Sequence, residues 1–123
     1  MSKHKILYIC QQIMPYLPEN EESKLCRELS QAMQERGNEI RTFMPRYGCV
    51  NERRNQLHEV IRLSGMNLII DDNDHQLIIK VASIPSARIQ IYFIDNEDFF
   101  SRRATVCDES GVEFEDNDER MVF

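Results

Sequence analysis

The chain has 123 residues, which is enough for one domain with a buried core, and 41% of them are hydrophobic and 29% charged. These fractions are ordinary for a globular protein and exclude a disordered or a fibrous chain. The formal net charge is -6, from 21 acidic and 15 basic residues. A field of that sign repels phosphate backbones, so the composition argues against nucleic acid as a partner.

The sequence carries no sign of export, of a membrane segment or of a metal site. Residues 1–5 lead directly into a short apolar run, without the pattern of an export signal. The four cysteines are widely spaced and form no Cys-x-x-Cys pair: Cys10, Cys26, Cys49 and Cys107. We therefore expect free thiols in a reducing cytoplasm, with no disulfide framework and no bound metal.

The first half of the chain predicts a strand, a helix and a second strand. Residues 5–10 form a compact apolar run, typical of a central strand buried on both faces of a parallel sheet, and a loop with two prolines follows. Residues 21–36 predict a helix ended by Gly37, with one apolar stripe made of Leu25, Cys26, Leu29, Ala32 and Met33. Residues 39–44 form the second strand, so a right-handed crossover to a parallel neighbour is predicted.

The second half predicts a β-hairpin and a further core strand. After a polar surface loop at 46–57, residues 60–70 and 77–84 are β-rich runs joined by an Asp- and Asn-rich turn at 71–76. This turn lacks the glycine and glutamate spacing of an EF-hand, so turn chemistry is preferred to a calcium loop. Residues 88–94 alternate and then become fully apolar, as in a core strand.

The end of the chain indicates a helix that has just begun. Residues 116–119 combine an Asp or Asn cap with an acidic first turn. The chain stops at Phe123, where an apolar helix stripe would have nothing to pack on. We therefore expect a domain truncated at its carboxyl end, whose incomplete edge could support self-association.

A ligand site is expected where the parallel strands end. In open α/β sheets, ligands bind beyond the carboxyl ends of the strands, which here are followed by the loops after Cys10, Met44 and Ile94. The candidate substrate-binding residues in these loops are Gln11, Gln12, Tyr16, Arg46, Tyr47 and Asp95. The loop after Cys10 contains no glycine, so neither a P-loop nor a dinucleotide fingerprint is present, and no cofactor is expected.

No catalytic residue is predicted from the sequence. The three histidines, His4, His58 and His75, are isolated, and no serine stands in a Gly-x-Ser-x-Gly context. Cys10 could be read as a nucleophile at a strand end, but a cysteine in an apolar strand is usually a packing residue.

Four segments, in order, resemble the bacterial and plant starch/glycogen synthases, which transfer glucose from a nucleotide sugar to a growing α-1,4-glucan. They are Met14-Pro15, Phe43-Met44-Pro45-Arg46-Tyr47, Ile91-Tyr92-Phe93-Ile94-Asp95, and Asp116-Asn117 with Arg120. The resemblance spans almost the whole chain and implies an α/β fold. Residues 1–123 would be the N-terminal segment of the first Rossmann-like lobe of a two-lobed (GT-B) glycosyltransferase, with an added β-hairpin. It also implies a nucleotide sugar and an α-glucan as partners.

The sequence departs from this family at the donor-binding loop. The family carries Lys-x-Gly-Gly after the first strand, where the lysine and the glycine backbone face the donor phosphates and sugar. Counting without gaps, the motif falls on Pro18, Glu19, Asn20 and Glu21, and Gln12 replaces a family acidic residue. The positive charge and the small residues are both lost, so donor phosphates would be repelled and the family's catalytic residues do not carry over.

Two functions remain open at this point. The first is a fragment of a divergent glucosyltransferase, inactive as this chain alone because the second lobe is missing. The second is a non-catalytic carbohydrate-binding or regulatory relative that kept the lobe and lost the donor loop. A truncated α/β domain with an exposed apolar edge and no further role is a third, plainer interpretation.

Overall fold

The structure is a computed structural model that describes residues 3–70, 72–84, 89–100, 105–106 and 112–123. Its strands are β1 (Lys5–Ile9), β2 (Glu39–Pro45), β3 (His58–Glu59), β4 (Met66–Ile70), β5 (Asn73–Ile84) and β6 (Ile89–Asp95). Its helices are α1 (Glu21–Glu35), the 3-10 turn η1 (Ile61–Leu63), α2 (Glu97–Phe100) and α3 (Asn117–Val122). Of the residues discussed above, Asp71, Arg88 and Cys107 lie outside the described part of the chain.

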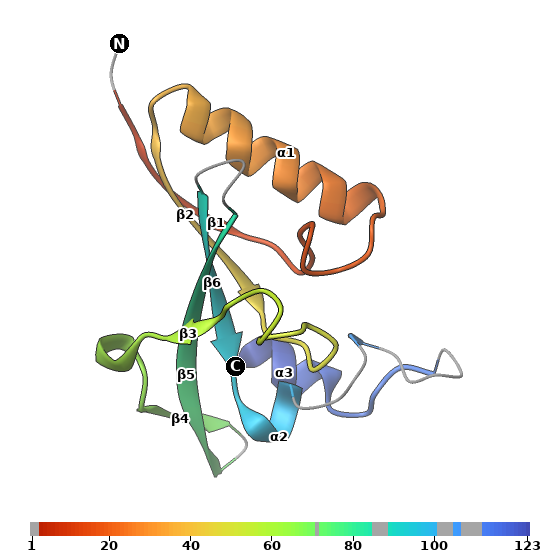
Figure 1. Ribbon diagram of the computed structural model, residues 1–123. Helices are drawn as coiled ribbons and strands as arrows, with labels where there is room; N and C mark the ends of the chain where they lie inside the picture. The colour runs from red at the N-terminus through yellow and green to blue at the C-terminus, as the bar shows by residue number, and fades with distance from the viewer. Residues whose placement is uncertain (1–2, 71, 85–88, 101–104, 107–111) are drawn as a thin grey trace.

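The strands form one mixed sheet in the order β1-β2-β6-β5-β3, and β4 pairs with β5 off this path (Figure 1). β1 pairs in parallel with β2, and β2 in parallel with β6. The long strand β5 then runs antiparallel to β6, with Ile79 opposite Ile94. Helix α1 connects the parallel strands β1 and β2, so the predicted α/β class with an added hairpin is confirmed.

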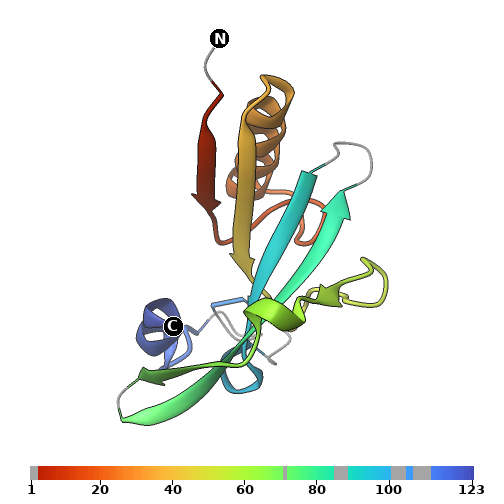
Figure 2. The same cartoon turned by 90° about the vertical axis from the view of Figure 1, so that its left-hand side faces the viewer.

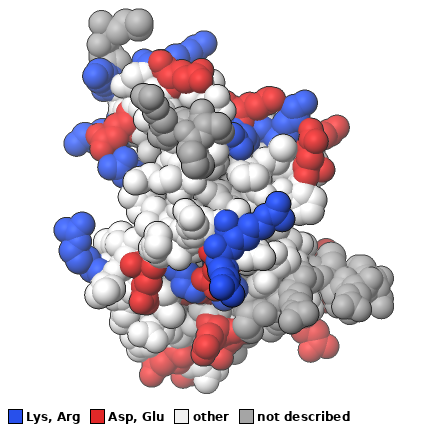
Figure 3. All heavy atoms as spheres, in the orientation of Figure 1, with Lys and Arg blue, Asp and Glu red and all other residues white. Residues whose placement is uncertain are grey.

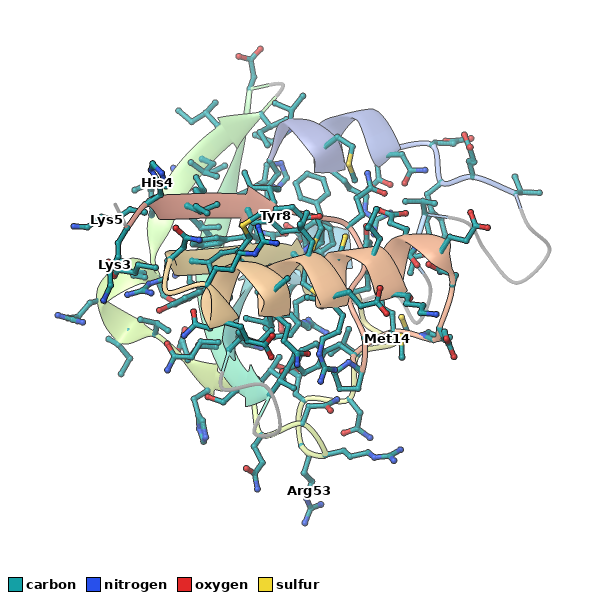
Figure 4. The ribbon with its side chains drawn as sticks, turned by 90° about the horizontal axis from the view of Figure 1, so that it is seen from above. Lys3, His4, Lys5, Tyr8, Met14 and Arg53 are labelled. Atoms are coloured by element: carbon teal, nitrogen blue, oxygen red, sulfur yellow. The ribbon has the colours of Figure 1, made fainter. Side chains whose placement is uncertain are left out.

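Strand β1 differs from the prediction, because it lies at an edge of the described sheet rather than at its centre. Tyr8 points toward α1, and its hydroxyl donates to Cys26 Sγ at 3.6 Å (Figure 4). Leu7 and Ile9 point to the opposite face and are 65% and 68% exposed. Figure 2 shows β1 and β2 with α1 behind them and no described helix directly in front. The apolar run therefore identified a strand correctly, but the neighbouring elements decide which of its faces are covered.

Helix α1 packs on the sheet through small side chains rather than through the predicted apolar stripe. Its buried residues are Ser23, Cys26 and Ser30. The Thr42 hydroxyl of β2 donates to Ser30 Oγ at 3.2 Å, which satisfies both buried hydroxyl groups. From the predicted stripe, Cys26 is buried as expected, whereas Leu25 is 60% exposed and Ala32 is also exposed. The predicted apolar stripe is therefore rotated by part of a helical turn away from the face of α1 that packs on the sheet.

The hairpin is tighter than predicted. Its turn includes Asp72 at a φ of 61°, a left-handed conformation that Asp adopts more readily than most residues. Asn73 already pairs with Ile70, so residues 73–76 belong to β5 and not to the turn. Residues 60–65 are not a strand, because residues 61–63 form η1 and the residues on either side of it have irregular backbone. Short turns allow the antiparallel ladder to continue to the tip of the hairpin.

The segment 46–57 is anchored in the core, although its polar composition predicted a surface loop. Tyr47 and Val50 are 0% and 3% exposed. Tyr47 packs edge-on against Phe100, with 5.9 Å between the ring centroids. These apolar contacts hold the first part of the segment in the core, whereas residues 51–57 remain exposed or half-exposed.

The carboxyl end is also packed, in contrast to the expectation that its helix would have nothing to contact. Helix α3 begins at Asn117, as predicted. The Phe123 ring lies 5.5 Å from that of Phe99 and 6.2 Å from that of Phe100. Of the described helices, none combines the length and the apolar composition needed to cross a membrane.

Candidate functional site

The carboxyl ends of the three parallel strands border a cavity of about 510 Å³. Its lining residues are Ile9, Cys10, Gln11, Glu22, Pro45, Ile94, Phe100, Arg120, Met121 and Phe123. Strand ends form one wall, and α3 with the chain end forms the other. An apolar surface with a few polar groups, at the strand ends of an α/β sheet, is the usual setting of a small-ligand site.

Arg120 is the buried cation of this cavity, and it is 2% exposed. Its Nη1 donates to Asn117 Oδ1 at 2.8 Å. The guanidinium also lies over the rings of Phe100, Phe114 and Tyr47, at 5.1, 5.5 and 5.7 Å from their centroids. These cation–π contacts fix the orientation of the positive charge. Burial raises the pKa of Tyr47, and the charge of Arg120 offsets part of that rise.

Arg120 was not among the predicted binding residues. Its one signal in the sequence is the family-like Asp-Asn-x-x-Arg pattern at residues 116–120. Glu22, which also lines the cavity, was interpreted as part of an acidic helix start. Both residues reach the site from helices rather than from the strand-end loops, so the expectation that the site lies in those loops did not include them.

Residues 20–23, in the segment where the resemblance predicted an altered donor loop, form the capped start of α1. Asn20 is the N-cap of α1: Ser23 N donates to its Oδ1 at 2.8 Å, and its own N donates to Ser23 Oγ at 2.9 Å. Glu21 and Glu22 occupy the first turn. The capping box satisfies amide groups that could otherwise face an anion, and the two carboxylates repel one. The start of α1 therefore disfavours phosphate.

Of the predicted binding residues Gln11 and Gln12, which follow β1, only Gln11 lines the strand-end cavity. Gln11 is exposed, lines the cavity, and places its Nε2 3.7 Å from Met121 Sδ. Gln12 instead accepts a hydrogen bond from the Asn20 side-chain amide. Of this pair, Gln11 is the one that presents its amide to the cavity, while Gln12 supports the capped start of α1.

Tyr16 and Tyr47, which were also predicted to bind substrate, are buried and do not line this cavity. Tyr16 is 6% exposed and packs edge-on against Phe93, with 4.9 Å between ring centroids. Burial raises the pKa of Tyr16 to about 12, against a lowering effect of Arg27. Tyr16 borders a separate pocket of about 390 Å³ beside the segment 49–55.

Arg46 and Asp95, the remaining predicted residues, form a buried ion pair. Arg46 Nη2 lies 2.9 Å from Asp95 Oδ1, and their side chains are 11% and 4% exposed. Lys80 Nζ lies 2.9 Å from Asp95 Oδ2 and also contacts Glu52. Burial lowers the pKa of Lys80, but its hydrogen bonds to Asp95 and Glu52 outweigh burial and raise that pKa overall.

This ion network lines a second, polar pocket of about 440 Å³. The pocket lies beside β5 and α2, at the end of the molecule where acidic side chains gather (Figure 3). The six predicted residues are thus divided among four places: Gln11 lines the strand-end cavity, Gln12 supports the cap of α1, the two tyrosines pack in the core, and Arg46 and Asp95 line the polar pocket. Within the described part of the chain, no group of three or more His, Cys, Asp or Glu residues could hold a metal ion.

Comparison with known proteins relates this geometry to a family. Residues 5–123 match the family model described as the starch synthase catalytic domain. The chain is 34% identical over 120 residues to the glycogen synthase of Chlorobium limicola, and 36% identical over 120 residues to that of Chlorobaculum tepidum. Each alignment covers 97% of this chain but 24% and 25% of the relatives, so the chain spans about a quarter of their length.

A solved structure supports the same assignment of the fold. The chain is similar to the catalytic domain of Starch Synthase IV from Arabidopsis thaliana bound to ADP and acarbose, with a TM-score of 0.73 and 17% identity. The similarity covers 89% of this chain and 22% of that chain, as a partial Rossmann-like lobe of a GT-B fold would. From the family match over nearly all of its length, the chain belongs to the starch synthase catalytic domain family.

Proposed function

We propose that this chain is the N-terminal segment of the first lobe of a glycogen/starch synthase-type protein, and that it forms one wall of a glucosyltransferase cleft. The reaction is transfer of glucose from a nucleotide sugar to an α-1,4-glucan. The observation that carries the proposal is the family match over residues 5–123. The cavity of about 510 Å³ at the strand ends supports it, because ligands of α/β sheets bind at this end.

Within the cleft, the cavity binds and orients sugar rather than performing chemistry. The Gln11 amide and the Glu22 carboxylate can exchange hydrogen bonds with sugar hydroxyl groups, and Ile9 and Met121 offer apolar contact to a ring face. Arg120 supplies a fixed positive charge beside them. We assign no general acid, base or nucleophile to this segment.

A transfer assay tests this proposal. The whole protein that contains this chain is incubated with ADP-glucose or UDP-glucose and a glucan primer. Release of nucleotide together with a longer primer supports the proposal. If the protein binds the primer and releases no nucleotide from either donor, the transferase proposal fails. We do not expect turnover by residues 1–123 alone, since they span about a quarter of the relatives.

The capped start of α1 favours a second function, a non-catalytic relative that binds glucan or regulates its synthesis. Where the family resemblance places a lysine and two glycines, this chain has the Asn20 capping box followed by Glu21 and Glu22. A helix start that carries two carboxylates, and whose backbone amide is already hydrogen-bonded by the cap, is a poor binding site for donor phosphates. In this function, the protein binds α-glucan without transferring glucose.

Calorimetric titration separates the two functions. The whole protein is titrated with maltooligosaccharides and, separately, with ADP-glucose and UDP-glucose. Glucan binding without donor binding supports the second function, and donor binding by the unmodified protein argues against it. A variant that combines Pro18→Lys, Asn20→Gly and Glu21→Gly recreates the family pattern, and it should gain donor affinity if this loop is the cause. No heat with maltooligosaccharides removes the second function.

A further inference from the structure

A pocket of about 390 Å³ lies between the loop after β1 and the segment 49–55, and the proposed function does not use it. Its walls come from residues 15–18 and from residues 49, 51, 54 and 55, and we call it the Arg54 pocket. It shares no lining residue with the strand-end cavity or with the polar pocket. The Arg54 pocket is therefore a separate place at which a small molecule can bind.

The charge of this pocket differs from that of the other two. Among the described residues, those that line it include one cation, Arg54, and no carboxylate. The strand-end cavity includes Glu22, and the polar pocket includes Asp95 with several other acids. Glu52 is close to Arg54 in sequence, but it pairs with Lys80 and does not line the Arg54 pocket. In a chain with a net charge of -6, this pocket can therefore attract an anion locally.

Arg54 is held by its backbone, and its guanidinium group is free. The backbone N of Arg54 donates to Asn51 Oδ1 at 2.8 Å, and Asn55 Nδ2 donates to the carbonyl oxygen of Asn51, also at 2.8 Å. Within the part of the chain that the structure describes, the guanidinium makes no ion pair and no hydrogen bond. A free guanidinium offers paired N–H donors that match two oxygens of a phosphate group.

Tyr16 adds a buried hydroxyl group to the lining. Its ring is fixed edge-on against Phe93, and the residue is 6% exposed. The hydroxyl has no hydrogen-bond partner among the described residues. Burial raises the pKa of Tyr16 to about 12, so the hydroxyl keeps its proton at neutral pH and can donate it to an anion. The charge of Arg27 offsets part of that rise, which shows that a positive field reaches this hydroxyl.

We propose that the Arg54 pocket is a phosphate-binding site, and that it takes a phosphate ester that carries a sugar or nucleoside ring. The Arg54 guanidinium binds two phosphate oxygens, and the Tyr16 hydroxyl and the Asn51 side-chain amide donate to the others. A volume of about 390 Å³ is within the range of small-ligand sites and leaves room for a ring beside the phosphate. Pro15 and Leu17 offer apolar contact to that ring.

Titration of the chain, followed by amide chemical shifts in nuclear magnetic resonance, tests the proposal without any turnover. The probes are inorganic phosphate, glucose 1-phosphate and ADP, with glucose as the uncharged control. We expect both esters to shift the amides of Tyr16, Leu17 and residues 49–55. Inorganic phosphate should shift the same amides with weaker affinity, because it lacks the ring, and glucose should not shift them. The tighter of the two esters identifies the ring that the pocket prefers.

The variant Arg54→Gln removes the cation and should weaken binding of both esters roughly tenfold. Arg53→Gln is the matched control. It removes the same charge from the next residue, but Arg53 is exposed, points away from the molecule and does not line the pocket (Figure 4). It should change affinity by less than about twofold. Tyr16→Phe keeps the ring, removes the hydroxyl and should also weaken binding. Heat with ADP-glucose that R54Q abolishes would come from this pocket and not from the start of α1.

Three results would overturn the proposal. The first is equal affinity of R54Q and R53Q, because the phosphate would then respond only to the general surface charge. The second is a shift of the same amides by glucose as strong as that by glucose 1-phosphate. The third is the absence of any shift at these residues with millimolar ester. Failure of the transfer assay changes none of these readouts, so the phosphate site and the transferase proposal can fail separately.

Discussion

The change Asp95→Asn tests whether the buried ion network is structural. Asp95 holds two cations, Arg46 Nη2 and Lys80 Nζ, each at 2.9 Å. Asparagine keeps the volume and some hydrogen bonding but removes the negative charge. Lys80 would retain its contact with Glu52, whereas Arg46 would lose the carboxylate that it pairs with. We therefore expect a loss of stability that is dominated by Arg46.

The size of the loss follows from burial. Removing one partner of a buried ion pair costs about 3–5 kcal/mol, because the other charge is left without compensation. The side chains of Arg46 and Lys80 are 11% and 20% exposed, so some water can reach them after the change. We expect the lower end of the range, about 3 kcal/mol, for D95N. That is roughly a hundredfold change in the folding equilibrium constant.

Urea unfolding measures this difference. The chain has no tryptophan, so far-ultraviolet circular dichroism is the convenient probe. The matched control is Glu39→Gln, which removes a pair with Arg41 of similar length, 3.1 Å, but with side chains 52% and 50% exposed. An exposed pair of this kind contributes less than about 1 kcal/mol. The shift in midpoint should therefore be clearly larger for D95N than for E39Q, with the same slope.

Equal midpoint shifts for D95N and E39Q would refute this reasoning. If D95N keeps wild-type stability but weakens binding of maltooligosaccharides, Asp95 is a binding residue, as its place at a strand end predicted. If D95N loses stability and keeps the wild-type affinity for glucan, the role of Asp95 is to stabilise the fold through the ion network.

Three further predictions concern the helix cap, a buried tyrosine and the open sheet face. Asn20→Ala should lower the free energy of unfolding by about 1 kcal/mol and Asn20→Gly by only a few tenths, measured by urea unfolding. Burial raises the pKa of Tyr16 from 10.0 to about 12, so its stabilising effect is complete below about pH 10 and is lost as pH rises toward about 12. Relative to Tyr16→Phe, the wild type should lose on the order of 2 kcal/mol over that interval, measured by urea unfolding at each pH. The apolar face of β1 predicts self-association at high concentration, which Ile9→Glu should weaken in light scattering and Ile61→Glu, on η1, should not.

Each of these predictions has a contradicting result. Equal stability of Asn20→Ala and the wild type would mean that the capping box does not hold the start of α1. Parallel pH profiles for Tyr16→Phe and the wild type would mean that the Tyr16 hydroxyl does not keep its proton through the interval. A wild type that is monomeric at every concentration, or equal effects of the two glutamate variants, would rule out association through β1.

Local patterns were sufficient to place most of the elements. The predicted helix at 21–36 is observed as Glu21–Glu35, and the predicted strand at 39–44 as Glu39–Pro45. Apolar runs and the Pro and Gly residues between them carry this information, because the spacing of apolar residues differs between a helix and a strand and Pro and Gly mark where an element ends. The ordered motifs were also sufficient to recognise the family, which the match over residues 5–123 confirms.

Burial was less predictable than element type. Leu25 looked like a core residue and is 60% exposed, while Ser23 and Ser30 are fully buried. Serine can be buried at low cost when its hydroxyl is hydrogen-bonded, as with Thr42 or within the cap, and a hydrophobicity pattern cannot see that partner. The same limit explains β1, whose apolar residues did not reveal that one face is open.

The sequence by itself determined the family and the parallel β-α-β order, because these depend on residue identity and order. The absence of lysine and glycine at residues 18–21 can also be read directly from the sequence. Only the tertiary structure decided that Asn20 closes the start of α1, that Arg46 and Asp95 bind each other, and that Arg120 joins the strand-end cavity. The ion pair and the cavity bring together residues that are far apart in the chain. All of these interactions depend on burial and on partner geometry, neither of which a local sequence pattern encodes.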